Sequence, residues 1–130
     1  MELRGVTMQN EKVFAMPFAK VYPMLIAKAE RKGRSRMEVL AVTSWLTGYT
    51  GEEIENLMNS DICYGDFFRS APAYNPKADL IKGSICGVKI AEIEDPLMKK
   101  IRQLDKLVDE LAKGKSLESP VSLYIEVAAE

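Results

Sequence analysis

The sequence predicts an α+β fold in which about four helices pack together and a small β component comes from residues 85–90 and 121–127. Three observations predict this class. Residues 95–114 form a long amphipathic helix whose beginning and end are both marked by capping residues. Two capping boxes begin further helices upstream. Residues 121–127 alternate between apolar and polar residues, as a half-buried strand does.

The chain has the length and composition of one domain, 1–130. A chain of this length buries roughly two-thirds of its unfolded surface, which suffices for a core without disulfides or metal. We expect residues 1–16 to be an irregular N-terminal segment, in which Val13 and Phe14 form either a short strand or a packing anchor. Residues 118–130 are expected to be a strand-like C-terminal extension.

The first helix is predicted to begin at Pro17, or to restart at Pro23, because proline inside a helix kinks it. It ends at Gly33. One face of this helix carries Phe18, Tyr22, Leu25, Ile26 and Ala29.

Two capped helices follow, joined by a short turn that contains glycine. In the first capping box, the Ser35 hydroxyl faces the amide of Glu38, whose carboxylate can reach back to the cap. Thr50 and Glu53 repeat the pattern. Residues 35–59 are therefore a helix–turn–helix in the geometric sense.

The second half of the chain holds a short helical turn around residues 67–68, a proline-containing loop at 72–76, and then the β-branched residues of 85–90. In the long helix, Asp95 is the N-cap and Pro96 occupies the first helical position. The apolar seam of this helix consists of Leu97, Ile101, Leu104, Val108 and Leu111.

The helix–turn–helix could in principle read DNA. A recognition helix places its N-terminal residues against base edges beneath the phosphates, and here those residues include Glu52, Glu53 and Glu55. Lysine and arginine total 18 against 19 acidic residues, so no excess of positive charge compensates. We expect weak or no DNA binding, and plain packing of a helical hairpin.

Charged clusters have functional and structural interpretations. One basic cluster consists of Lys28, Arg31, Lys32, Arg34 and Arg36. It could bind an acidic partner or a phosphate, or it could serve the C-terminal end of a helix, with the acidic turn at residues 52–55 nearby. Carboxylates such as Asp105 and Asp109 could bind a cation, but on a helix rich in lysine and arginine they favour intrahelical ion pairs.

The chain contains no histidine, which excludes Ser–His and Cys–His nucleophile pairs and histidine-based zinc sites. We predict no catalytic residue, no metal and no cofactor. Four side chains near the loop could contact a small ligand: Tyr74, Asn75, Lys82 and Cys86. The glycines at 83 and 87 do not match a phosphate-binding loop, and a buried, inert Cys86 is favoured over a reactive thiol.

Several stretches of the sequence resemble one family of small bacterial proteins, known only as domain of unknown function 2200. The stretches are Phe18–Pro23, Trp45–Tyr49, Asn75–Pro76, Leu80–Gly83, Ile85–Gly87, Glu94–Met98 and Leu104–Lys115. The resemblance covers about residues 12–117 and implies a bacterial cytoplasmic protein. It implies no activity, substrate, cofactor or catalytic residue. Residues 118–130 look like an extension beyond the part of the chain that resembles the family.

The sequence leaves three functions open. The first is a non-enzymatic interaction or oligomerisation module, a homodimer to which the long helix and the 121–127 strand contribute. The second is a small-ligand-binding protein or enzyme with a pocket near residues 72–87, and the third is a DNA-binding regulator. Two cysteines 23 residues apart and an apolar run no longer than 21–27, against the ~20 residues that span a bilayer, predict a cytoplasmic protein without a membrane segment.

Overall fold

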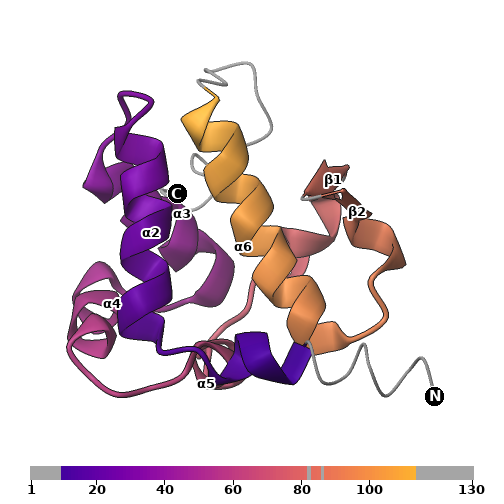
Figure 1. Ribbon diagram of the computed structural model, residues 1–130, viewed down its shortest axis with the longest axis horizontal. Coiled ribbons are helices and arrows are strands. Elements are labelled where there is room, and N and C mark those ends of the chain that lie inside the picture. The colour runs from indigo at the N-terminus through magenta and orange to yellow at the C-terminus, as the bar shows by residue number, and fades with distance from the viewer. Residues whose placement is uncertain (1–9, 82, 86, 114–130) are drawn as a thin grey trace.

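The computed structural model describes residues 10–81, 83–85 and 87–113. Figure 1 shows the elements in their arrangement. Residues 10–15 are helical. They are followed by α2 (Phe18–Glu30), α3 (Arg36–Thr47), α4 (Gly51–Met58), α5 (Tyr64–Arg69), the 3-10 turn η1 (Pro76–Leu80), β1 (Ser84–Ile85), β2 (Val88–Lys89), the 3-10 turn η2 (Ile90–Glu92) and α6 (Pro96–Ala112). The predicted α+β class is confirmed, since helices dominate and a small antiparallel sheet accompanies them.

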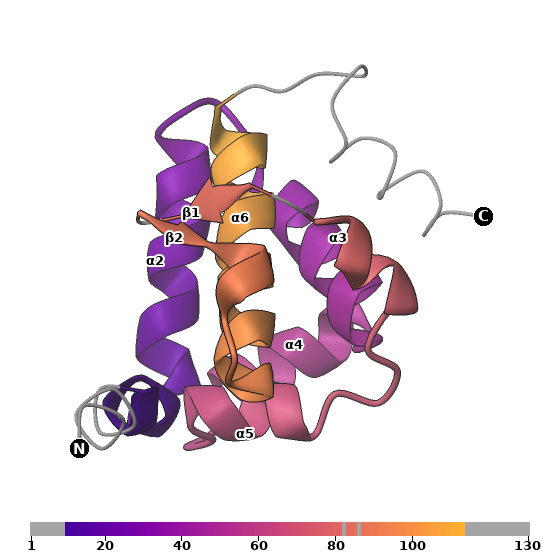
Figure 2. The ribbon, with the colours of Figure 1, turned by 90° about the vertical axis from the view of Figure 1, so that its right-hand side faces the viewer.

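Helix α6 is the central element, with α2 and α3 on either side of it and the β1–β2 hairpin across its face (Figure 2). Its N-terminus is capped as predicted, because the Asp95 carboxylate accepts hydrogen bonds from the amides of Leu97 at 2.9 Å and Met98 at 3.0 Å. Four of the five predicted seam residues are buried, and the fifth, Leu97, is half-buried. The seam is thus the interior of the fold.

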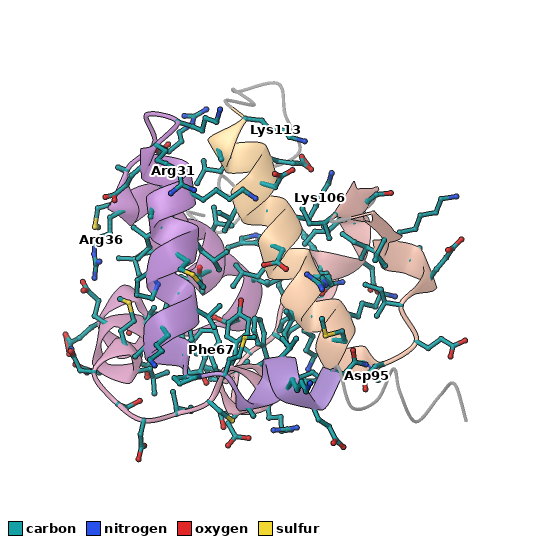
Figure 3. All side chains as sticks on the ribbon, in the orientation of Figure 1. Arg31, Arg36, Phe67, Asp95, Lys106 and Lys113 are labelled. Atoms are coloured by element: carbon teal, nitrogen blue, oxygen red, sulfur yellow. The ribbon has the colours of Figure 1, made fainter. Side chains whose placement is uncertain are left out.

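An aromatic cluster closes the end of the bundle where α2 meets α5. The rings of Phe18 and Phe67 stack with centroids 4.1 Å apart, and Tyr22 stacks on Phe18 at 4.9 Å. Figure 3 shows Phe67 in the interior of the molecule. Helix α2 begins directly after Pro17 and continues through Pro23, whose ring is exposed, so the restart at Pro23 is not needed.

The N-terminal segment differs from the prediction, because residues 10–15 are helical rather than irregular. Val13 and Phe14 pack against the core as an anchor, not as a strand. The physical reason is the contact of Phe14 with Gly65: a Cβ atom added to Gly65 would lie 2.8 Å from the Cβ atom of Phe14. Only a glycine allows the two helical segments to come this close. Residues 1–9 lie outside the described part of the chain.

Both predicted capping boxes are present, and they give the helix–turn–helix of α3 and α4. The predicted strand segment 85–90 is instead a two-stranded hairpin in which Ile85 pairs with Val88. Gly87 makes the turn, with a φ of 77° that disfavours other residues. The predicted strand at 121–127 and the extension at 118–130 lie outside the described residues.

Candidate functional site

The loop that carries Tyr74 and Asn75 returns to the C-terminal end of α3. The backbone amide of Asn75 donates to the carbonyl of Leu46 at 2.8 Å, and its side-chain amide donates to the carbonyl of Trp45 at 3.1 Å. The last carbonyls of a helix have no partner within the helix, so this loop supplies one. Asn75 therefore has a structural role at the end of α3.

The close return of the loop depends on Gly48, the residue that ends α3. Its φ is 85°, and a Cβ atom added to it would lie 2.7 Å from the backbone nitrogen of Ala73. That amide donates to the carbonyl of Thr47 at 3.1 Å. Gly48 is required both for the left-handed turn and for the space that the loop occupies.

Next to this junction lies a cavity of about 250 Å³, here called the Tyr74 pocket. It is lined by Tyr74, Asn75, Pro76, Ala78, Asp79, Pro96, Lys99, Lys100 and Gln103. Two of the four predicted ligand contacts, Tyr74 and Asn75, are thus brought together. The other two, Lys82 and Cys86, lie outside the described residues.

The polar groups of the Tyr74 pocket largely bind one another. The Tyr74 hydroxyl donates to the side-chain carbonyl of Gln103, whose amide nitrogen donates to the Ala78 carbonyl at 3.3 Å. The Lys100 ammonium lies 4.7 Å from the centroid of the Tyr74 ring, a cation–π geometry. Burial, with a smaller contribution from the Asp79 carboxylate, raises the pKa of Tyr74 far above its usual value, so the phenol stays protonated at neutral pH. Tyr74 and Gln103 therefore form a preformed side of the pocket, and neither of them is available as a general base.

A larger cavity of about 460 Å³ lies on the outer side of the helix–turn–helix, and we call it the α3–α4 groove. Its surface is mainly apolar, and it is lined by Met37, Leu40, Ala41, Ser44, Gly51, Glu52, Glu55 and Asn56. Leu40 is buried at 4% exposure, whereas Met37 is 70% exposed. This surface was not predicted from the sequence, although Met37, Ala41 and Ser44 recur at the spacing of a second stripe on α3.

An ion pair marks one end of the groove. Arg36 binds the carboxylate of Glu55, and both side chains are close to half exposed. Figure 3 places Arg36 on the edge of the molecule opposite the β1–β2 hairpin. Glu52 lies one turn earlier in α4, beside Gly51, and is also exposed. The groove is thus mainly apolar, with two carboxylates of α4 in its lining and Arg36 beside one of them.

Residues of the basic cluster form ion pairs and hydrogen bonds within the fold, which agrees with the structural interpretation of this cluster. Lys28 lies 3.1 Å from Asp109 of α6, and the Arg34 guanidinium donates to the Leu111 carbonyl at 3.0 Å, at the C-terminal end of α6. Arg36 reaches the acidic turn of α4. On α6 itself, Asp105 pairs with Arg102 and Asp109 pairs with Lys113, the intrahelical pairs that the sequence predicted.

Comparison with known proteins places this fold in a family. A family model described as an uncharacterized protein conserved in bacteria, domain of unknown function 2200, matches residues 12–121. The chain belongs to this family. The crystal structure of the uncharacterized protein SP1917 is similar, with 50% sequence identity, a TM-score of 0.82, and coverage of 92% of this chain and 95% of that chain. No curated protein sequence matches.

Within the described ranges, none of the helices combines the length and apolar character needed to cross a membrane. The same part of the chain contains no group of three histidine, cysteine, aspartate or glutamate residues that could hold a metal ion.

Proposed function

We propose that this member of family 2200 is a non-enzymatic, cytoplasmic interaction module that forms a homodimer through the outer faces of α3 and α4. The observation that carries the proposal is the α3–α4 groove, a mainly apolar cavity of about 460 Å³ on the protein surface. A strongly exposed methionine, Met37, stands at its rim. Exposed apolar patches with a polar border are typical of protein-binding surfaces.

The groove is a better dimer interface than α6, which the sequence had favoured. The apolar seam of α6 is covered by α2, α3, α5 and β1 of the same chain. A seam buried in this way has no apolar area left for a second copy. The contribution expected from the 121–127 strand lies outside the described residues and stays a prediction.

A non-enzymatic role is supported by the chemistry available in the chain. With no histidine, the usual bases for serine and cysteine nucleophiles are missing from the sequence. In the Tyr74 pocket, Tyr74 and Gln103 are hydrogen-bonded to each other, and the raised pKa of Tyr74 keeps its proton in place. These groups bind well but transfer protons poorly at neutral pH.

The helix–turn–helix remains a poor DNA reader. Glu52, Glu53 and Glu55 are exposed in the first turns of α4, where a recognition helix would approach base edges. We expect no sub-micromolar affinity for any duplex at physiological salt. A fluorescence anisotropy titration against a pool of random duplexes measures this, and tight binding that survives added salt would favour a DNA-binding regulator instead.

The proposal is tested by the mass of the full-length chain in solution, measured by light scattering and native mass spectrometry. We expect a homodimer at tens of micromolar. Ala41→Glu places a charge in the groove and should give a monomer with an almost unchanged melting temperature. Ala91→Glu is the matched control, because Ala91 is also exposed but lies in η2, and it should remain dimeric. A monomeric wild-type chain would contradict the homodimer.

The Tyr74 pocket supports a second candidate function, the binding of a small ligand near residues 72–87. The specific observation is that Tyr74 and Asn75 line a cavity together with the side chains of Lys99 and Lys100. These two cations outnumber the one carboxylate of the lining, Asp79, so the pocket favours a ligand that carries a negative charge. Native mass spectrometry of protein purified from bacteria would show such a ligand as excess mass, lost in a Lys99→Met, Lys100→Met double variant.

A further inference from the structure

We infer that two copies of this chain meet with their α3 helices antiparallel about a two-fold axis near Ala41, so that Met37 of each copy enters the groove of the other. This inference rests on the proposed homodimer and gives it a geometry. It specifies the residue at the two-fold axis, the residue that enters the groove, and the charged residues that meet across the interface.

The first argument is that the protruding Met37 side chain and the α3–α4 groove lie on the same face of the molecule. A two-fold interface uses one patch twice, so that patch must carry both a protruding side chain and the space that receives it. Met37 protrudes at 70% exposure, and the space beyond it is lined by the small residues Ala41, Ser44 and Gly51. A Cβ atom added to Gly51 would meet nothing within 4 Å, which shows how open this wall is.

The second argument is the spacing along α3. With 1.5 Å of rise per residue, Met37 lies about 6 Å before Ala41 and Ser44 lies about 4.5 Å after it. Reversing the direction of one helix about Ala41 therefore brings each Met37 to within roughly 2 Å, along the axis, of the other copy's Ser44. Alanine at the crossing point allows close approach of the two helices, because helix separation depends on the side chains at the contact.

The third argument is charge. Gly51 follows the end of α3 by four residues, whereas the Arg36–Glu55 ion pair ties the later part of α4 to the beginning of α3. Glu52 consequently lies toward the C-terminal half of α3. After the two-fold rotation, this is where the other copy's Arg36 arrives, so each guanidinium lies between its own Glu55 and the other copy's Glu52.

A second copy fits this groove better than the C-terminal residues of the same chain. Residues 114–130 contain three glutamates, Glu118, Glu126 and Glu130, against one cation, Lys115. Such a segment would be repelled by Glu52 and Glu55, which line the groove. A second copy also brings Glu52 and Glu55, but the two-fold rotation sets the Arg36 of each copy beside the Glu52 of the other, and it brings the exposed methionine that the apolar space accommodates.

The axis is tested by cross-linking at Ala41 in the full-length chain with Cys63→Ser and Cys86→Ser. A residue on a two-fold axis lies next to its own copy, and a disulfide needs Cβ atoms about 3.5–4.5 Å apart. Ala41→Cys should give a covalent dimer under mild oxidation, whereas the matched control Ala91→Cys should not. If the chain is dimeric but Ala41→Cys does not cross-link, this geometry is wrong while the interaction module stands.

The charge arrangement is tested by reversal. Arg36→Glu should raise the dimer dissociation constant at least tenfold. Adding Glu52→Arg should restore the dimer, because it rebuilds the contact between copies, whereas adding Glu55→Arg rebuilds only the contact within one chain. Restoration by Glu55→Arg alone would overturn the axis. A monomeric wild-type chain that dimerises only after removal of residues 114–130 would assign the groove to that segment and overturn both proposals.

Discussion

Helix α6 and the α3–α4 pair differ in how much of their side-chain surface is buried. In α6, each residue from 97 to 112 is buried or half-buried, because the helix lies in the middle of the fold. In the α3–α4 pair, one face enters the core through residues such as Leu46 and Ile54, while the other presents Met37 and Ala41 to solvent. The strongest amphipathic pattern in the sequence is therefore buried by folding, and the exposed apolar groove lies on helices with a weaker pattern.

The largest expected effect is on the buried side of this comparison. Leu104 is fully buried in α6, so Leu104→Ala should lower the free energy of unfolding by about 2–5 kcal/mol. Leu80→Ala is the matched control, because Leu80 is 56% exposed and should cost about 0.5 kcal/mol or less. Urea unfolding followed by circular dichroism gives both values, and equal effects would mean that α6 is not the centre of the core.

Gly48 should show the next largest effect. Gly48→Ala combines a φ of 85° with the clash against Ala73, so we expect a loss of about 2–4 kcal/mol. Gly33 has the same φ but nothing within 4 Å of its missing Cβ atom. Gly33→Ala should therefore cost only the strain, about 1–2 kcal/mol. Thermal melts of the two variants compare them directly, and equal losses would show that the loop at residues 73–75 does not press against α3.

Methionine substitutions separate folding from association. Met98 of α6 is 7% exposed, so Met98→Ala should destabilise the fold by about 2 kcal/mol or more. Met37→Ala should change the free energy of unfolding of the monomer by about 0.5 kcal/mol or less. The same variant should weaken the dimer, which sedimentation velocity measures. If Met37→Ala instead leaves association unchanged, the groove is not the interface.

The smallest expected effects come from two aspartates one turn apart on α6. Burial acts to raise the pKa of Asp109, but hydrogen bonds from Lys113 and Lys28 outweigh it and hold the pKa below its usual value. The stability that Asp109 contributes is present at neutral pH and is lost as the pH falls through this lowered pKa. Asp109→Asn should thus destabilise at pH 7 by about 1 kcal/mol, and the difference from wild type should vanish in acid.

Asp105 should show the opposite sign. Burial raises its pKa despite the ion pair with Arg102, so ionisation opposes folding, and its contribution to stability is lost as the pH rises through the raised pKa. Asp105→Asn should leave the melting temperature unchanged or slightly higher at pH 7, with the gain disappearing in acid. A clear loss at pH 7 would mean that the Arg102 ion pair is worth more than the burial costs.

The features that sequence reasoning predicted correctly are local ones. The Asp95 cap, the two capping boxes and the seam around Leu104 depend on residues within a few turns of one another. The helical segment at residues 10–15 was not predicted, because it packs Phe14 against Gly65, about fifty residues away. Local pattern carries no information about such a partner.

The candidate site shows the same limit. Tyr74 and Asn75 were chosen as ligand contacts for their residue types, and they do line one cavity. The hydrogen bond from Asn75 to Trp45 spans thirty residues of sequence, so the structural role of that amide could not be read from its neighbourhood. The α3–α4 groove went unnoticed for a different reason: the stripe of Met37, Ala41 and Ser44 is periodic, but small residues in a stripe do not show whether the space beside them is filled or empty.

The return of residues 73–75 to the end of α3 has a consequence for how the chain is made. The ribosome makes α3 and α4 before it makes this loop. The last carbonyls of α3 can therefore bind only water until about thirty further residues have been made, because their hydrogen-bond donors lie in residues 73–75. We therefore expect an excised α3–α4 segment to lose the partners of the last α3 carbonyls and to fray at that end of the helix. The end of α3 should reach its final geometry only when residues 73–75 have been made and can supply these hydrogen bonds.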